Sequence, residues 1–346
     1  MRIAQVAPLH ESVPPALYGG TERVVSYLTE ALVELGHDVT LFASGDSRTA
    51  ARLEAVWPTA LRRDPAIRDS LVPHFLLLEA VRRRAHEFDV IHFHLDYATF
   101  SVFSRQPTPY LVTLHGRLDW PELQTVFKAF DTLPVVSISD DQRRPLPRLN
   151  WRATVHHGLP QTLLTPCTDI APSYLAFLGR IAPEKRVDLA IRIAQRCGMR
   201  IRIAAKIDAA DRDYFENEIR PLMTLPHVDF IGEISDAEKP AFLSGAHALL
   251  FPLDWSEPFG LVMIEAMACG TPVIAFRRGS VPEVLDEGVS GFIVDDEDGA
   301  VAAVSRLGQL ARASVRQCFD SRFTSRRMAL HYVEVYRALI SARAAS

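Results

Sequence analysis

Short apolar runs alternate with amphipathic segments along the first half of the chain, and each run has the length and composition of a buried strand. Each run is followed by a stretch with helical spacing or by a loop. Strands and helices that alternate in this way predict a parallel sheet covered by helices on both faces. The predicted strands are residues 2–7, 38–43, 89–94, 110–115 and 134–138.

The same alternation restarts after a polar, irregular passage at residues 161–172. A second parallel sheet is therefore expected, and the fold class is α/β with two doubly wound, Rossmann-like domains. We place the first domain at residues 1–165, the second at 166–322 and a terminal helix at 323–346. Ligands of such sheets bind at the carboxyl ends of the strands, so the expected active site is the cleft between the domains. The second set of predicted strands is residues 174–178, 201–205, 227–231, 248–251, 273–276 and 291–294.

The composition is that of a globular protein, and it narrows the classes of partner. The 346 residues are 48% hydrophobic and 23% charged, with a net charge of −4. Neither half has an excess of basic residues, so no nucleic-acid partner is expected. The first residues do not read as a signal peptide and no run approaches the ~20 apolar residues of a spanning helix, so we expect a cytoplasmic protein, with peripheral contact to the inner face of the membrane left open. The four dispersed cysteines read as buried thiols, without the Cys-x-x-Cys pair of a zinc knuckle: Cys167, Cys197, Cys269 and Cys318.

Two carboxylates bracket an apolar stretch at residues 257–265, which is predicted to be a helix with Pro258 in its first turn and Gly270 after its end. Glu265 lies among aliphatic residues, where an unpaired carboxylate would cost several kcal/mol. The hydroxyl donors of a polyol ligand would satisfy it without a counter-charge. The alternative is structural: Glu257 caps the helix, and Glu265 extends to solvent or meets an arginine.

A strand that ends in a glycine leads into the cations Arg180 and Lys185, just before a second predicted helix. A guanidinium can bind phosphate oxygens with two hydrogen bonds, an ammonium adds a compact charge, and a helix amino terminus adds its positive end. The segment therefore predicts a phosphate site. A solvated basic loop is the alternative.

Residues 14–25 follow the first strand and contain Gly19 and Gly20, whose bare amides could approach an anion, with Thr21 as the expected helix N-cap. A simple turn is the alternative reading. The fingerprint Gly-x-Gly-x-x-Gly of dinucleotide-binding proteins is absent, which weighs against nicotinamide chemistry.

His115 follows another predicted strand and should project from the carboxyl edge of the first sheet. Nearby Asp119 could orient a substrate hydroxyl, although a charged loop residue explains it as well.

Other polar clusters have structural explanations. His92 and His94 alternate so that both rings face one side, as in a metal site, but no third ligand lies at the spacing of a known metal motif and we expect no metal. The acidic pair in residues 211–213 is expected to begin a helix. Basic clusters at residues 82–84 and 143–152 are expected to be solvated helix faces, because neither is matched to an evident apolar stripe.

Three of these segments, together with His115 at its strand end, resemble the retaining glycosyltransferases of family 4, also called group 1. Residues 257–265 are similar to that family's E-x7-E segment, Arg180 to Lys185 to its Gly-Arg-x-x-x-x-Lys loop, and Gly19-Gly20 to its Gly-Gly-x-Glu loop. The resemblance implies a GT-B fold whose terminal helix packs back on the first domain. It also implies transfer of a sugar from a nucleotide-diphosphate sugar, UDP- or GDP-linked, without a metal or other cofactor.

The resemblance also implies roles for individual residues. The catalytic set would be His115 on the transferred sugar, Arg180 and Lys185 on the diphosphate, and Glu257 on the hydroxyls of the donor sugar. Glu265 would accept the ribose hydroxyls, and Ile234 would lie near the nucleobase. The remaining donor-binding residues are Gly19, Gly20, Phe259, Gly260 and Leu261.

The acceptor is left open, as a carbohydrate, a lipid-linked sugar or a small molecule. Residues 156–160 depart from the family, in which Asn-Gly and an aliphatic residue are common, so no subfamily is assigned. Two other functions are weighed: a sugar-nucleotide epimerase or hydrolase on the same fold, and a non-catalytic subunit that binds sugar nucleotides.

Overall fold

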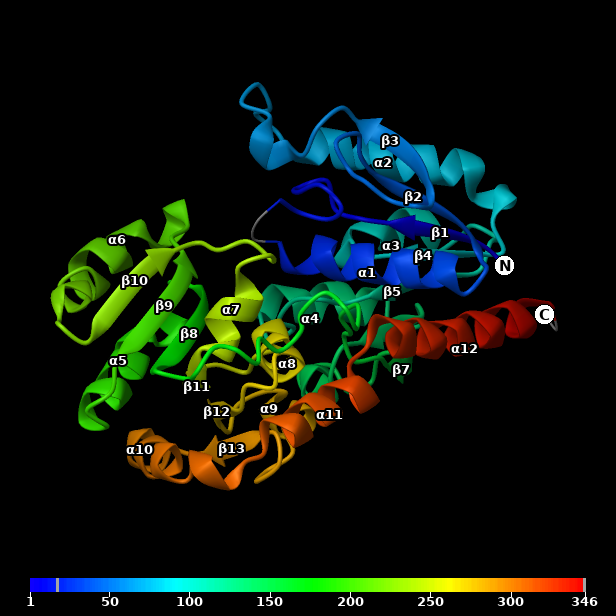
Figure 1. The fold of residues 1–346 in the computed structure, drawn as a ribbon. Helices are drawn as coiled ribbons and strands as arrows, with labels where there is room; N and C mark the ends of the chain where they lie inside the picture. Colours follow the sequence, from blue (N-terminus) through cyan, green and yellow to red (C-terminus); the bar gives the residue numbers. More distant parts are fainter. Residues whose placement is uncertain (17–18, 345–346) are drawn as a thin grey trace. The chain divides into compact units, whose positions relative to one another are not determined.

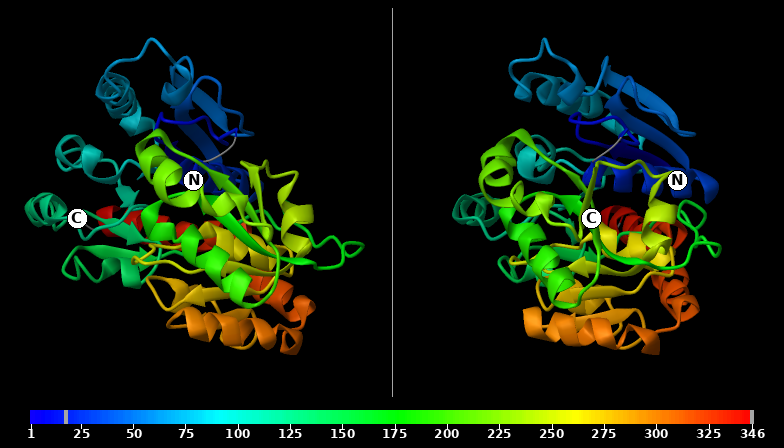
Figure 2. Two further views of the ribbon diagram at one scale, coloured as in Figure 1. Left: turned by 90° about the vertical axis from the view of Figure 1, so that its left-hand side faces the viewer. Right: turned by 60° about the vertical axis from the view of Figure 1, so that its left-hand side comes forward.

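The computed structural model describes residues 1–16 and 19–344. These residues form two compact units, of which the first contains Met1–Pro160 with Ser325–Ser346 and the second Gln161–Thr324. Each unit is built on a parallel sheet, and helices lie on both sides of each sheet (Figures 1 and 2). The predicted pair of parallel sheets is confirmed.

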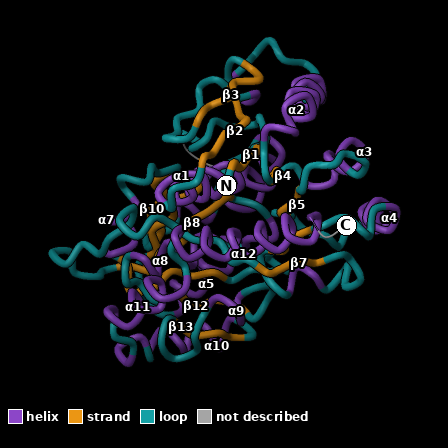
Figure 3. The backbone as a smooth tube through the Cα atoms, turned by 90° about the vertical axis from the view of Figure 1, so that its right-hand side faces the viewer, coloured by secondary structure: helices purple, strands orange, loops and turns teal. Residues whose placement is uncertain are grey.

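The first unit contains a seven-stranded sheet in the order β3-β2-β1-β4-β5-β6-β7 (Figure 3). Most of its strands bury both faces, which explains their continuous apolar sequences. The strands are β1 (Arg2–Val6), β2 (Asp38–Ser44), β3 (Arg52–Trp57), β4 (Val90–Phe93), β5 (Tyr110–Thr113), β6 (Val135–Ser137) and β7 (Trp151–Thr154). The α-helices are α1 (Gly20–Glu34), α2 (Leu71–Arg84), α3 (Phe100–Phe103), α4 (Pro121–Ala129) and α12 (Ser325–Ala344).

The pattern of apolar runs missed the two edge strands of this sheet, β3 and β7. Residues of β3 are exposed or half-buried throughout, and β7 has no fully buried residue. An edge strand faces solvent on one side, so selection for a continuous apolar run is weak there.

The second unit contains a six-stranded sheet in the order β10-β9-β8-β11-β12-β13. Its core is formed mainly by aliphatic residues of the central strands and of α5. The strands are β8 (Tyr174–Arg180), β9 (Ile201–Lys206), β10 (Val228–Gly232), β11 (Ala246–Phe251), β12 (Val273–Phe276) and β13 (Gly291–Val294). The α-helices are α5 (Val187–Arg196), α6 (Arg212–Tyr214), α7 (Lys239–Ser244), α8 (Leu261–Ala268), α9 (Val281–Val284), α10 (Glu297–Ser305) and α11 (Arg312–Arg322).

The terminal helix α12 lies beside α1 within the first unit (Figure 1). It buries the rings of Tyr332 and Tyr336 against β4, and the ring centre of Tyr332 is 4.7 Å from that of His92. The helix therefore belongs to the core of this unit, although some 170 residues of chain separate it from β7.

Replacing Tyr332 with alanine is expected to lower the free energy of unfolding by about 3 to 5 kcal/mol, because a buried aromatic ring leaves a cavity. Leu330 lies on the same helix but is 44% exposed, so Leu330→Ala should cost under about 0.5 kcal/mol. Urea unfolding followed by circular dichroism measures both. Equal losses would contradict the burial of α12 in this core.

Candidate active site

The segment with the two glutamates begins in a loop and continues as helix α8. Gly260 is the N-cap, with φ of 77°, and a Cβ there would lie 2.9 Å from the ring of Phe251. The helix begins only at Leu261, so the prediction that Pro258 lies in its first turn is wrong: the left-handed glycine ends the loop after the proline. Gly270 follows the end of the helix with φ of 67°, as expected for a C-terminal glycine.

Glu257 meets Lys185. The Lys185 ammonium donates to the Glu257 carboxylate, and both side chains are largely buried, at 16% and 13% exposure. The same ammonium lies 5.0 Å from the ring centre of Trp255, a cation–π distance. The structure therefore brings together two of the predicted catalytic residues, which are 72 positions apart in the sequence.

Backbone contacts hold this pair in place at the carboxyl edge of the second sheet. The Asp254 amide donates to the Glu184 carbonyl at 3.0 Å, which joins the loops after β11 and β8. The Ser280 amide donates to the Glu257 carbonyl at 3.0 Å, which adds the loop after β12. A Cβ on Gly279, where φ is 55°, would lie 2.3 Å from that same carbonyl oxygen. Three loops thus fix Glu257, and Gly279 permits their close approach.

Arg180, at the end of β8, is surrounded by acids. Its guanidinium donates to Asp211 at 2.6 Å and to Glu184 at 2.7 Å, and Asp208 lies 3.9 Å away. Asp211 also precedes the short helix α6, as its acidic sequence predicted. The two predicted phosphate-binding cations are therefore both neutralised by carboxylates within the described structure.

Glu265 is buried on α8 and pairs with a lysine. The Lys239 ammonium donates to Glu265 Oε1 at 2.7 Å, and Asp236 lies 3.0 Å from the same nitrogen. The alternative in which an arginine pairs with this acid is wrong about the residue, because the partner is Lys239. The prediction that ligand hydroxyls bind Glu265 stays a prediction. Lys239 opens α7, directly after the loop that carries the half-buried Ile234.

In the first unit, His115 follows β5 and is half-buried. Its Nε2 lies 2.8 Å from Nδ1 of His94, and its ring stacks on that of His157 at 5.3 Å between centres and 18° between planes. His157 comes from the segment 156–160 that departs from the family pattern, so this departure lies directly against a predicted catalytic residue. Asp96 Oδ1 accepts from the His115 amide at 3.4 Å. Sequence reasoning missed His157 and Asp96.

The glycine pair lies at the start of α1. Gly19 is the N-cap, and Gly20 is the first helical residue, so the expectation that Thr21 caps the helix is wrong. A Cβ on Gly19 would lie 2.8 Å from Cβ of Pro15, while one on Gly20 would meet nothing within 4 Å. Of the predicted loop, Leu17 and Tyr18 lie outside the described residues.

The remaining residues singled out in the sequence are Asp119, the pair His92 and His94, and the four cysteines. Asp119 forms a two-pronged ion pair with Arg117, at 2.6 and 2.7 Å. The rings of His92 and His94 lie side by side, 4.1 Å apart between centres, as their alternation predicted. No group of three or more His, Cys, Asp or Glu residues in the described part of the chain is arranged to hold a metal ion. Of the four cysteines only Cys269 is buried, and the others are half-buried thiols.

The apolar face of α2 corrects another prediction. The residues that share one side of its first turns are exposed, at 49% to 64%: Leu71, Val72, Phe75 and Leu76. Arg82 and Arg83 follow on the same helix, at 51% and 73% side-chain exposure, and both pair with Glu79. The basic cluster of α2 is therefore combined with an apolar surface. None of the helices that the structure describes is both long and apolar enough to cross a bilayer.

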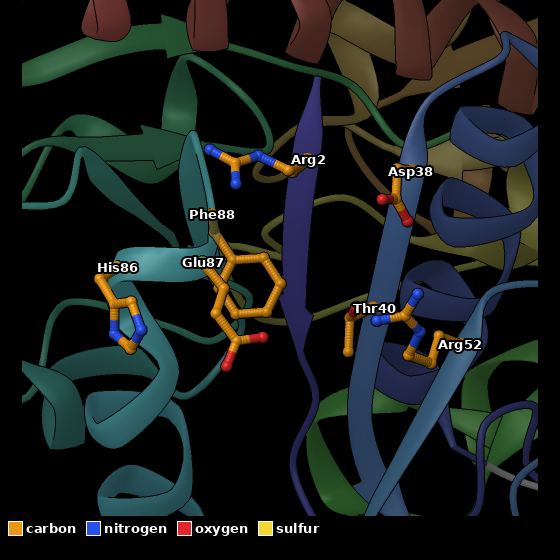
Figure 4. Close-up of a pocket in the computed structure, with 7 residues that line it drawn as sticks. All are labelled: Arg2, Asp38, Thr40, Arg52, His86, Glu87 and Phe88. Carbon is orange, nitrogen blue, oxygen red and sulfur yellow. The ribbon is translucent and has the colours of Figure 1, made fainter.

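A cavity of about 370 Å³ lies at the edge of the first sheet where the strands begin, opposite the carboxyl edge (Figure 4). Its lining comes from the amino-terminal parts of β1 to β3 and from the segment before β4. The lining residues are Arg2, Asp38, Thr40, Arg52, His86, Glu87 and Phe88. Because His115 follows the carboxyl end of β5, this cavity is not part of the predicted site.

Comparisons with known proteins identify the class. The family model "Glycosyl transferases group 1" matches residues 170–311, and "Glycosyltransferase Family 4" matches residues 18–187. The chain is a glycosyltransferase with the GT-B fold, in enzyme class EC 2.4. It belongs to glycosyltransferase family 4, as its motifs predicted.

Several relatives resemble the chain over nearly its full length. It is 27% identical to the phosphatidyl-myo-inositol mannosyltransferase of Mycolicibacterium smegmatis, over 91% of this chain and 89% of that protein. The crystal structure of AviGT4, a glycosyltransferase involved in avilamycin A biosynthesis, has a TM-score of 0.73 at 25% identity and covers 99% of this chain and 98% of its own. Anabaena Alr3699/HepE in complex with UDP-glucose has a TM-score of 0.73 at 17% identity, covering 98% and 100%.

Acid should destabilise the protein through its buried histidines. Burial lowers the pKa of His92, His94 and His157, and lowers that of His115 to about 3. The unfolded chain takes up protons near pH 6.5 while the folded chain does not, so stability is present above pH 6.5 and is lost as the pH falls. Asp96 acts in the opposite sense, because burial raises its pKa to about 6.

We expect the free energy of unfolding to fall by at least about 2 kcal/mol between pH 7 and pH 5.5, since each such histidine contributes up to about 1.4 kcal/mol per pH unit. His157→Phe should reduce this loss by about 1 kcal/mol, whereas replacing the exposed His86 with phenylalanine should not change it. Urea unfolding at the two pH values measures the difference. A stability that does not change over this range would contradict the burial of neutral histidines.

Proposed function

We propose that this protein is a retaining glycosyltransferase that moves a sugar from a UDP- or GDP-linked donor to a hydroxyl acceptor without a metal ion. The contact between Lys185 and Glu257 carries the proposal. A nucleotide-diphosphate sugar offers each of them a better partner: its phosphate oxygens can replace the carboxylate at Lys185, and its sugar hydroxyls can replace the ammonium at Glu257. One molecule with both groups can therefore open the pair without leaving a buried charge unpaired.

In this proposal, catalysis is electrostatic. Lys185 and Arg180 stabilise the charge that develops on the departing diphosphate, in the role that a metal ion has in other enzymes. The amino end of α8, at Gly260 and Leu261, faces the same anion with its positive end and its amides, and the buried Phe259 directly precedes this turn. Retention of configuration then rests on same-face attack assisted by the leaving phosphate, and no protein nucleophile is assigned.

Further donor contacts follow from the same reasoning. Oε1 of Glu265 accepts from Lys239, and within the described structure Oε2 is left to accept from the ribose hydroxyls. Ile234, from the loop that leads to Lys239, is the candidate contact for the nucleobase. His115 is proposed to contact the transferred sugar, and Gly19 and Gly20 to offer their amides to the donor phosphates. A UDP donor is favoured by the HepE relative, whose structure contains UDP-glucose.

Lys185→Gln is expected to lower kcat/KM for the donor by at least about 30-fold, equivalent to about 2 kcal/mol of transition-state stabilisation. Lys128→Gln is the matched control, because this lysine is exposed on α4, and it should not change the rate. The assay measures the release of nucleoside diphosphate with and without a chelator. Unchanged turnover in Lys185→Gln would contradict the phosphate assignment, and activity that requires added magnesium would contradict metal independence.

The same assay separates the two other functions. A transferase releases nucleoside diphosphate as the sugar is joined to a supplied acceptor, whereas a hydrolase releases it at the same rate without an acceptor. An epimerase converts the donor into its epimer, so it is detected by analysis of the remaining sugar nucleotide. A non-catalytic binding subunit would show thermal stabilisation by the donor with no turnover in any acceptor mixture.

We also propose that the protein meets its acceptor at a membrane surface, through the apolar face of α2 defined above. An exposed apolar face followed by arginines on one helix is typical of helices that lie in the interface of an anionic bilayer. The M. smegmatis relative, whose name describes a phosphatidyl-inositol acceptor, points in the same direction.

The double variant Phe75→Ser, Leu76→Ser should reduce co-sedimentation with phosphatidylglycerol vesicles by at least about fivefold, because about 1 kcal/mol of apolar insertion is lost per side chain. Leu330→Ser removes another exposed apolar residue, on α12, and should have no effect. Equal binding of the wild type and the double variant would contradict this proposal, whereas donor turnover tests the transferase function separately.

A further inference from the structure

A chain of hydrogen-bonded side chains crosses the core of the first unit and ends on His115. Tyr336 of α12 lies 2.9 Å from Nε2 of Gln5, on β1. Oε1 of Gln5 lies 2.9 Å from Nε2 of His94, whose Nδ1 lies 2.8 Å from Nε2 of His115. Gln5, His94 and Tyr336 are at most 2% exposed, so water does not replace any of these partners.

The direction of these hydrogen bonds follows from the chemistry of each group. The Gln5 carbonyl can only accept, so Nε2 of His94 carries the proton. A neutral imidazole has one N–H, which makes Nδ1 of His94 an acceptor. The proton between the two rings therefore belongs to Nε2 of His115, and Nδ1 of His115 is left with a lone pair. The structure gives Nδ1 of His115 no hydrogen-bond partner among the described residues.

A side branch of the network has the same direction. The Gln5 amide donates to the Tyr336 hydroxyl, which can then donate to Nδ1 of His92 at 2.8 Å. Nε2 of His92 donates to Thr113 at 2.7 Å, and Thr113 donates to the hydroxyl of Tyr332 at 2.9 Å. Every link has one donor and one acceptor. Both branches start at Gln5, so the orientation of one amide sets the protons of all three rings.

We propose that His94 is a positioning residue, which Gln5 and Tyr336 hold so that it keeps His115 in the Nε2–H tautomer. Nδ1 of His115 is then a fixed hydrogen-bond acceptor, suited to a hydroxyl of the transferred sugar and unable to donate to it. The inference rests on the proposed function, in which His115 contacts that sugar. It specifies this contact further: the sugar hydroxyl donates the hydrogen bond, and Nδ1 of His115 accepts it.

Burial supports this arrangement. It lowers the pKa of His92 and His94, and it lowers that of His115 to about 3, so all three rings are neutral near pH 7. A protonated ring would donate from both nitrogens and would break the chain at the next donor. Neutral rings therefore permit one continuous direction of donation, from His115 through His94 and Gln5 to Tyr336 of α12.

The direct test is a two-bond ¹H–¹⁵N NMR spectrum of the full chain with ¹⁵N-labelled histidine, in which the shifts of the two ring nitrogens show which one is protonated. The signals of His115 are assigned by their absence in His115→Gln. We expect the Nε2–H form in the wild type, without any ligand. His94→Phe keeps the ring volume but removes the acceptor, so the His115 signals should shift toward a mixture of tautomers.

Kinetics with the donor then separates positioning from stability. His94→Phe should lower kcat by about 10-fold to 100-fold with less than a twofold change in donor KM, the scale seen when partners that fix a histidine are removed. His94→Asn places an amide oxygen near the former Nδ1, so it should restore both the tautomer and most of the rate. Tyr110→Phe is the control: it removes a buried hydroxyl from β5, the strand that leads to His115, and Tyr110 takes no part in the hydrogen-bonded network.

An Nδ1–H signal for His115 in the wild type would overturn the inference, as would a His94→Asn variant no better than His94→Phe in a folded protein. These outcomes leave the glycosyltransferase proposal intact. If no donor is turned over, the proposed function fails, and the NMR spectrum still decides the tautomer.

Discussion

The rule that a buried charge needs a partner governs the second unit. Two acids, one before α8 and one within it, each pair with a lysine. Glu257 pairs with Lys185, and Glu265 pairs with Lys239. Breaking such a pair by removing one member costs more than the pair contributes, because the other charge is left buried. The pairs therefore fix loops from several strand ends in one arrangement. In the proposed function the Lys185–Glu257 pair also selects the ligand, since a molecule that offers an anion and hydroxyl donors together can replace both members of the pair.

The first unit meets the same constraint without charge. Its core contains histidines, tyrosines and a glutamine in one hydrogen-bonded network, and burial keeps the rings neutral. Such a network stabilises the fold only when every member is satisfied. The terminal helix α12 completes it with Tyr332 and Tyr336, so this helix serves the site region as well as the core. The two units thus differ in chemistry: the second has buried lysine–glutamate ion pairs, and the first has a neutral His115 ring held by hydrogen bonds.

The sequence was sufficient for the parallel sheets, for the family and for the end of α8 at Gly270, because continuous apolar runs and spaced motifs are local signals. Local signals cannot identify partners. Lys239 lies 26 residues from Glu265 with no pattern that links them, and two of the acids around Arg180, Asp208 and Asp211, come from a separate loop. Pro258 was placed in a helix because proline is common in first turns, whereas the left-handed Gly260 delays the start. Of the buried histidines, the alternation of His92 and His94 was visible, but their tyrosine partners on α12 were not.

In the proposed function, the donor binds at the Lys185–Glu257 pair. A crystal structure with the nucleotide sugar that most raises the melting temperature tests it most directly. We expect the pair to be open in this complex, with Nζ of Lys185 on a phosphate oxygen and the Glu257 carboxylate on hydroxyls of the sugar. A bound donor that leaves the pair intact, or that lies away from the carboxyl edge of the second sheet, would contradict it.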